Sequence, residues 1–180
     1  MDLIKKRIEN FKLLSSKEHE IITASEMIKT ALQNGNKIFL CGNGGSASDS
    51  NHLAAEFISK FKRERASYPA ISLCANNSVL TAIANDYSFE NIFKRQLEGL
   101  AQTGDILIAL STSGKSKNVL CALEYAKAKG MKTIFLTGQN PSGVGADLEI
   151  NAPSEITAEI QEMHIALGHI IVELVEQGLN

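Results

Sequence analysis

Short apolar runs alternate with amphipathic segments along most of the chain. The runs that predict buried strands lie at residues 37–41, 70–74, 105–110, 132–136 and 148–150. The segments with helical spacing of apolar residues cover 47–61, 77–84, 88–101, 116–129 and 155–178. Strands that alternate with helices form a parallel sheet covered on both faces. The pattern predicts an α/β three-layer sandwich with a central five-stranded parallel sheet.

A long helix is predicted ahead of the first strand. Apolar residues recur at helical spacing over 2–33, and Asn34-Gly35-Asn36 ends the segment. A helix of this length needs a second surface to cover its apolar side chains. We therefore expect residues 1–35 to pack partly on their own domain and partly on neighbouring subunits. With no linker in the sequence, we expect residues 1–180 to form a single domain.

Composition narrows the classes of function. The 180 residues carry 18 basic and 20 acidic side chains, with no basic stripe, so we do not expect nucleic acid as a partner. No apolar run approaches the length of a membrane span, and the first residues lack the apolar core of a signal peptide. We therefore expect a cytoplasmic protein with no membrane partner. The odd number of scattered cysteines, Cys41, Cys74 and Cys121, predicts buried reduced thiols rather than disulfides.

A glycine-rich turn, residues 41–48, follows the first predicted strand. It satisfies the loose G-x-G-x-x-A pattern of dinucleotide sites. A dinucleotide site also needs a carboxylate at the end of the next strand to hold a ribose. The next strand ends in residues 74–77, Cys-Ala-Asn-Asn, which contain no carboxylate. Dinucleotide binding is therefore disfavoured.

A second polar turn, residues 111–116, follows the third predicted strand. Its end imitates a P-loop, but the glycine that a P-loop needs is replaced by Ala109, so an NTPase is disfavoured. The turn instead crowds four hydroxyl groups at the start of a helix, on Ser111, Thr112, Ser113 and Ser116. A helix N-terminus of this kind suits a phosphate monoester. The alternative is ordinary helix capping, which needs only one hydroxyl.

His52 and Glu56 are four residues apart on the helix predicted after the glycine turn, so both project from one face. Such a pair can ligate a divalent metal ion. A His–Glu pair on a solvated surface has the same spacing, and the pair taken alone favours this second interpretation.

The last predicted helix carries Gln161, His164 and His169. Gln161 and His169 fall along one stripe, separated by about 12 Å along the helix axis. For both to reach one metal ion, either the helix bends near Gly168 or ligands from different subunits converge, and we favour the second. His164 projects off this stripe, which predicts a hydrogen-bonded structural histidine.

Asn85 and Asp86 follow an apolar helical segment at a predicted turn. Asp86 either orients a sugar hydroxyl or caps the next helix, and the sequence favours neither.

Together these turns and helices resemble the phosphoheptose isomerase family, whose fold is the sugar isomerase (SIS) domain. The similarity covers nearly the whole chain, and the combination of motifs is specific although no single motif is. The matching residues are Cys41-Gly42-Asn43-Gly44-Gly45-Ser46, His52 with Glu56, Asn85-Asp86, Ser111-Thr112-Ser113-Gly114 with Ser116, and Ile160-Gln161-Glu162 followed by His169.

The resemblance implies a homotetramer with sites at the subunit interfaces. It implies interconversion of sedoheptulose 7-phosphate and D-glycero-D-manno-heptose 7-phosphate through an enediol, the first step of heptose biosynthesis for a bacterial lipopolysaccharide or capsule. It also implies one Zn²⁺ per subunit, held by His52, Glu56, Gln161 and His169. We assign Glu56 as the base and His169 as the matching acid/base. The expected substrate contacts are Asn43, Gly44, Gly45, Ser46, Glu56, Asn85, Asp86, Ser111, Thr112, Ser113, Ser116 and Gln161.

The sequence also departs from the family pattern. Members often carry an arginine four residues after the metal-site glutamate, where this chain has Lys60, and a lysine cannot make the bidentate contacts of arginine. The loop 138–143 is short. The alternative function is a non-catalytic adaptor of the same fold that binds the bacterial replication initiator protein. In that class the metal and acid/base positions are eroded, whereas all four are present here.

Overall fold

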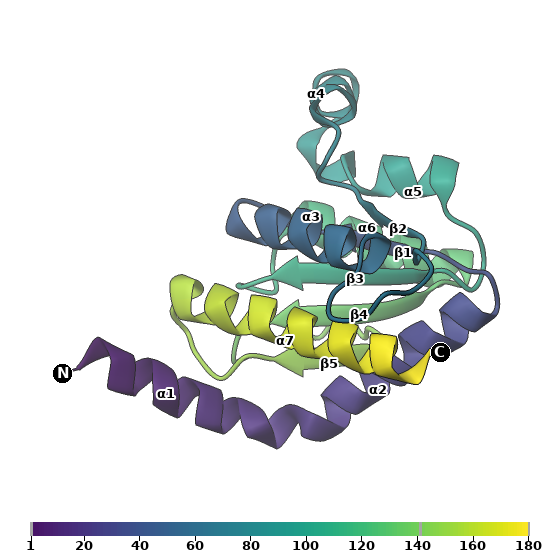
Figure 1. Ribbon diagram of the computed structural model, residues 1–180. Helices are drawn as coiled ribbons and strands as arrows, with labels where there is room; N and C mark the ends of the chain where they lie inside the picture. Colours follow the sequence, from purple (N-terminus) through teal and green to yellow (C-terminus); the bar gives the residue numbers. More distant parts are fainter. Residues whose placement is uncertain (1, 141, 180) are drawn as a thin grey trace.

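The central sheet has the predicted architecture. The computed structural model describes residues 2–140 and 142–179. Its strands are β1 Ile38–Cys41, β2 Ala70–Ser72, β3 Ile106–Ser111, β4 Lys132–Thr137 and β5 Leu148–Asn151. They form one parallel sheet in the order β2-β1-β3-β4-β5, which confirms the expectation of five parallel strands (Figure 1).

Helices cover both faces of this sheet. They are α1 Leu3–Leu14, α2 Glu18–Gln33, α3 Gly45–Ile58, α4 Asn77–Asp86, α5 Lys94–Leu100, α6 Lys117–Lys129 and α7 Thr157–Gly178. Alternate side chains of the strands point to opposite faces. Ile38 and Leu40 therefore join a core with α2, α3 and α7, whereas Phe39 and Cys41 join a second core with α5 and α6. Among the described helices, none has the length and apolar character needed to cross a membrane.

The predicted N-terminal helix is interrupted by one turn of 3-10 helix, Ser15–Lys17. The hydroxyl of Ser15 donates to the Lys12 carbonyl oxygen at 2.6 Å, and that of Ser16 donates to the Leu13 carbonyl oxygen at 2.8 Å. Hydroxyls that bond back to the preceding turn often bend a helix. After this turn α2 packs against α7. Before it, α1 extends along the side of the molecule (Figure 1).

Other boundaries also differ from the prediction. Strand β2 ends at Ser72 rather than at residue 74, and helix α3 covers Gly45–Ile58 rather than 47–61. The segment 88–101 is a 3-10 turn, Phe89–Asn91, followed by the short helix α5. Apolar residues keep their helical spacing across this break, so their periodicity does not reveal it. Helix α4, capped by the Asn76 side chain, projects from the body of the molecule (Figure 1).

The glycine turn and the serine turn lie side by side. Strands β1 and β3 are neighbours, and Cys41 at the end of β1 is in register with Ala109 near the end of β3. Both turns therefore leave the sheet at its carboxyl edge, where parallel sheets bind ligands. Cys41 and Cys74 are buried beside the glycine turn, and burial raises the pKa of both thiols, whereas Cys121 is only partly buried.

Candidate metal and phosphate site

The two turns enclose a cavity of about 230 Å³ at the carboxyl edge of the sheet. Its lining combines the glycine turn, the serine turn and the start of α7: Asn43, Gly44, Gly45, Ser46, Leu110, Ser111, Thr112, Ser116, Thr157 and Gln161. A Cβ atom at Gly45 would lie 2.6 Å from Nε2 of Gln161. The absence of a side chain at Gly45 therefore lets the Gln161 amide reach the N-terminus of α3.

The hydroxyl groups of the serine turn do not serve as an ordinary helix cap. Ser116 is the N-cap residue of α6, but its side chain makes no capping hydrogen bond and instead lies 3.0 Å from the hydroxyl of Ser111. Ser113 accepts a hydrogen bond from the Lys115 N–H at 3.2 Å and lines a neighbouring cavity of about 180 Å³, which Thr112 shares. This arrangement favours an anion site over simple capping at the start of α6.

The Asn43 side chain is occupied by a protein partner. Its amide and that of Asn118 exchange two hydrogen bonds, at 2.9 and 2.8 Å. This pair ties the glycine turn to the first turn of α6. Asn43 therefore lines the cavity while its side-chain amide holds the loop in place. The sequence did not predict Asn118 as a residue that holds the glycine turn, because a polar residue early in a helix has no distinctive pattern.

A second group of side chains lies further along α3. His52, Glu56 and His169 each offer a ligand atom, and these three atoms lie within 4.8 Å of one another. The Nε2 atoms of His52 and His169 are 2.8 Å apart, and Nε2 of His52 is 3.4 Å from Oε1 of Glu56. All three residues belong to one chain, because α3 and α7 run side by side.

This group fits a divalent metal ion. Two imidazole nitrogens and one carboxylate oxygen are a donor set that catalytic zinc sites use, with a position left for substrate. Burial and the neighbouring His52 lower the pKa of His169, although Glu56 opposes the shift. A lowered pKa keeps the imidazole neutral, which is the form that binds metal.

Gln161 does not join this group in its own chain. Its amide lies against Gly45, and Gln161 itself is eight residues before His169, about 12 Å along the axis of α7. The packing of α3 beside α7 thus separates a cavity end, with Gly45 and Gln161, from a metal-binding end, with His52, Glu56 and His169.

His164 is a buried histidine whose Nε2 lies 2.9 Å from the Thr137 carbonyl oxygen, as a structural role requires. Burial lowers its pKa to about 4, even though the hydrogen bond to Thr137 acts in the opposite direction. Its Nδ1 has no hydrogen-bond partner among the described residues. His164 is therefore neutral, and it is not one of the three side chains of the metal-binding group.

Asn85 and Asp86 end the projecting helix α4, where the Asn85 amide donates to the Asp86 carboxylate at 2.8 Å. Neither residue lines the cavity at the two turns in the described part of the chain. Asp86 does not cap the following helical turn either, since its N-cap residue is Ser88. In a single chain both residues stand apart from the rest of the site.

Comparison with known proteins decides between the classes considered. The SIS domain family matches residues 4–138. A phosphoheptose isomerase from a Nitratiruptor species is 54% identical over 88% of this chain and 86% of its own length. That of Akkermansia muciniphila is 46% identical over 95% of this chain and 92% of its own. The chain belongs to the phosphoheptose isomerase family.

Solved structures of the phosphoheptose isomerase family agree with this assignment. The phosphoheptose isomerase of Neisseria gonorrhoeae has a TM-score of 0.90 at 35% identity, covering 97% of this chain and 95% of that one. The Francisella tularensis enzyme has a TM-score of 0.93 at 32% identity, with the same coverage. Membership of this family confirms the expected SIS fold and an isomerase that acts on a sugar phosphate.

Proposed function

We propose that this protein interconverts sedoheptulose 7-phosphate and D-glycero-D-manno-heptose 7-phosphate. The spacing of the two ends of the site carries the proposal. Gly45 and His52 are separated by about 10 Å along α3. An extended chain gains about 1.2 Å per bond, so the phosphorus of a heptose 7-phosphate lies roughly 8–10 Å from C2 and C1. A phosphate held in the cavity that Gly45 shares with the serine turn would therefore place the reacting carbons near His52, and so beside Glu56 and His169.

The reaction moves one proton between C1 and C2 through an enediol, and a second proton between their oxygens. Glu56 is the proposed base at carbon, because its carboxylate is partly shielded and faces the two histidines. His169 transfers the proton at oxygen, and its lowered pKa favours a neutral imidazole that can accept one. Oε1 of Glu56 is the oxygen next to His52, which leaves Oε2 for the proton.

Zn²⁺ is the proposed ion, one per subunit, held by His52, Glu56 and His169. When bound, it would polarise the substrate carbonyl as a Lewis acid. Gln161 remains a predicted fourth ligand contributed by a neighbouring subunit, since in its own chain the amide lies at Gly45. Within its own chain we assign Gln161 to the substrate.

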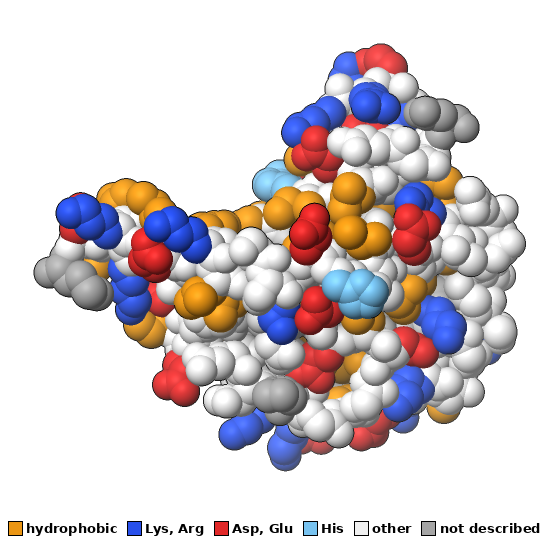
Figure 2. Space-filling view, turned by 90° about the horizontal axis from the view of Figure 1, so that it is seen from below, with side chains coloured by type: hydrophobic (Ala, Val, Ile, Leu, Met, Phe, Trp, Pro, Cys, Tyr) orange, Lys and Arg blue, Asp and Glu red, His pale blue; other side chains and the backbone are white. Residues whose placement is uncertain are grey.

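A homotetramer with sites at subunit interfaces is part of the proposal. An apolar groove of about 520 Å³ lies between α1, α2 and α7. Large apolar side chains are exposed along α1, namely Leu3, Ile4, Ile8, Phe11 and Leu13. Figure 2 shows hydrophobic side chains along the hollowed upper left edge of the molecule. Exposed apolar patches of this kind support association, and the projecting Asn85 and Asp86 would then reach a neighbouring subunit's site.

The test is incubation of the purified protein with sedoheptulose 7-phosphate, with and without a chelator, followed by NMR. We expect the heptose aldose to form, and the chelator to stop the reaction until Zn²⁺ is restored. Glu56→Gln and His169→Ala should each lower the rate by on the order of 10²–10⁴ while the protein stays folded. Near-normal turnover in either variant would contradict its role. A protein without zinc and without isomerase activity would favour the adaptor alternative. The polysaccharide pathway and a cytoplasmic location remain predictions.

A further inference from the structure

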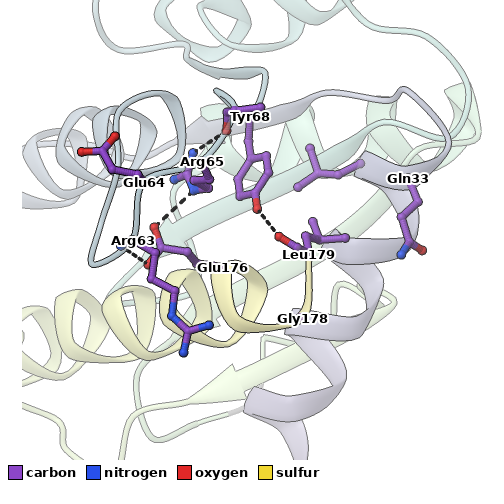
Figure 3. A pocket seen from close by; sticks show the side chains of 10 residues that line it. Gln33, Arg63, Glu64, Arg65, Tyr68, Glu176, Gly178 and Leu179 are labelled. Atoms are coloured by element: carbon purple, nitrogen blue, oxygen red, sulfur yellow. Dashed lines mark hydrogen bonds and ion pairs between the residues drawn. The ribbon is translucent and has the colours of Figure 1, made fainter.

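The segment 59–68 follows α3 in the chain and packs against the end of α7, so it contacts both helices that carry the metal-binding group. Helix α3 ends at Ile58, two residues after Glu56, and helix α7 ends at Gly178, nine residues after His169. The last carbonyl groups of a helix have no partner within it, so something else must satisfy them. At the end of α3 this partner is the side chain of Arg65, which Figure 3 shows beside Tyr68 and Glu176.

Arg65 satisfies the carbonyl groups at the end of α3. Its Nη2 donates to the Glu56 carbonyl oxygen at 2.8 Å, and its Nη1 donates to that of Phe57 at 2.9 Å. The guanidinium lies 3.9 Å from the centre of the Tyr68 ring, and only 7% of the side chain is exposed. A cation at a helix C-terminus is stabilised by the helix dipole. Arg65 is thus fixed from several sides and holds the backbone of Glu56.

Glu176, near the end of α7, holds the same segment from the other side. Its carboxylate accepts hydrogen bonds from the backbone N–H groups of Phe61, Lys62 and Arg63, at 3.1, 2.9 and 3.1 Å. It also accepts one from Nε of Arg65 at 3.2 Å. Burial alone would raise its pKa, but these N–H donors and Arg65 lower it. Glu176 is therefore a charged, buried acceptor.

One residue of this segment touches the metal-binding group directly. The ring of Phe61 packs on the imidazole of His169, with ring centres 5.3 Å apart and planes 34° apart. His169 also contacts His52 edge to face, at 5.0 Å between ring centres. Because Glu176 anchors the Phe61 backbone, it fixes the surface against which His169 rests.

We propose that Arg65 and Glu176 are positioning residues that set His169 on α7 against Glu56 on α3. The pair connects the Glu56 backbone, through Arg65, to the helix that carries His169. This inference rests on the proposed function, since it concerns the spacing of the proposed metal ligands. Neither side chain lines the cavity at the two turns. Replacing a residue that orients a metal ligand without binding the metal itself typically lowers metal affinity or activity by about 10–100-fold.

The two variants to compare are Glu176→Gln and Arg65→Lys. Glu176→Gln keeps the shape but replaces one acceptor oxygen by a donor, which faces backbone N–H groups. Arg65→Lys keeps the charge but cannot bridge the two carbonyl oxygens and the carboxylate at once. It is also the milder change, so it keeps the test valid if Glu176→Gln folds poorly.

The matched control is Asp105→Asn. Asp105 is fully buried and accepts hydrogen bonds from the backbone N–H groups of Lys37 and Gln102, both at 2.8 Å. It lies just before β3, at the opposite edge of the sheet from the two turns. Asp105→Asn therefore replaces a comparable buried carboxylate by an amide, far from the metal-binding group and the cavity.

The decisive readout is the Zn²⁺ affinity of each metal-free protein, measured by competition with a chromophoric chelator, alongside kcat, KM and urea unfolding. We expect Glu176→Gln and Arg65→Lys to lose about 10–100-fold in Zn²⁺ affinity. Their kcat should fall while KM changes little, since the phosphate cavity is at the other end of α3. Asp105→Asn should lower only the free energy of unfolding and leave Zn²⁺ affinity, kcat and KM unchanged.

Two results would overturn the inference in distinguishable ways. If the unaltered protein binds Zn²⁺ tightly and both variants match Asp105→Asn in Zn²⁺ affinity and kcat, the pair is merely structural and the proposed function stands. If the unaltered protein binds no Zn²⁺, the proposed zinc site and this inference fail together, whereas the isomerase assay decides the proposed reaction separately.

Discussion

Acidification should destabilise this protein through one buried histidine. His164 is fully buried on α7, and burial lowers its pKa to about 4 from the usual 6.5. The folded protein therefore excludes a proton that the unfolded chain accepts. Above pH 6.5 His164 is neutral in both the folded and the unfolded protein, so it does not lower the free energy of unfolding. Between pH 6.5 and 4 the unfolded state binds more protons, so the free energy of unfolding falls as the pH falls. Below about pH 4 this loss is complete.

The size of the effect follows from the two pKa values. A difference of about 2.5 units corresponds to a total loss of about 3 kcal/mol. At pH 5 most of the transition has occurred, and the expected loss relative to pH 8 is about 2 kcal/mol. Against a typical stability of roughly 5–15 kcal/mol, this contribution is large enough to measure.

The assay is urea unfolding of the metal-free protein at pH 8 and pH 5, at one fixed protein concentration because assembly also contributes to stability. His164→Gln is the comparison, since its amide nitrogen can donate to the Thr137 carbonyl oxygen as Nε2 does now but does not titrate. We expect the loss between pH 8 and pH 5 to be smaller in the variant by about 2 kcal/mol. Equal losses in both proteins would refute the reasoning, because every other titrating group is shared.

Three further predictions concern the packing of α3 on α7, the substrate cavity and the assembly. Gly168→Ala should lower stability by about 1–3 kcal/mol in urea unfolding, because its Cβ would lie 2.5 Å from Leu53 and push α7 away from α3; unchanged stability would contradict this packing. Gly45→Ala should raise KM for the sugar phosphate, because its Cβ would displace the Gln161 amide; an unchanged KM would remove Gln161 from the substrate site. Ile8→Lys combined with Phe11→Lys should lower the mass measured by light scattering during size-exclusion chromatography, whereas an unchanged oligomer would place the interface elsewhere.

The fold followed from the sequence because its signal is local. Buried parallel strands are short apolar runs, and each of the five was found within two residues of its boundary at either end. The errors occurred where side-chain hydrogen bonds, not apolar spacing, decide the backbone. Ser15 and Ser16 bond back to the preceding turn and interrupt the N-terminal helix, although the apolar periodicity continues past them.

The site was only partly predictable for a related reason. The spacing of His52 and Glu56 places them on one face of a helix, and that was correct. Which part of α7 meets them depends on how two helices far apart in the sequence pack together, which spacing does not encode. Gln161 therefore lies at Gly45 while His169 lies at His52. The contact of Arg65 with Glu176 is equally non-local.

The central claim is that one metal ion is held by two imidazoles and one carboxylate of the same chain. X-ray absorption at the zinc edge of the purified, zinc-loaded protein tests it most directly. The account predicts two histidine nitrogens at about 2.0–2.1 Å with oxygen or nitrogen completing the shell, and the loss of one histidine in His169→Ala. A zinc shell without histidine, or one unchanged in that variant, would contradict it.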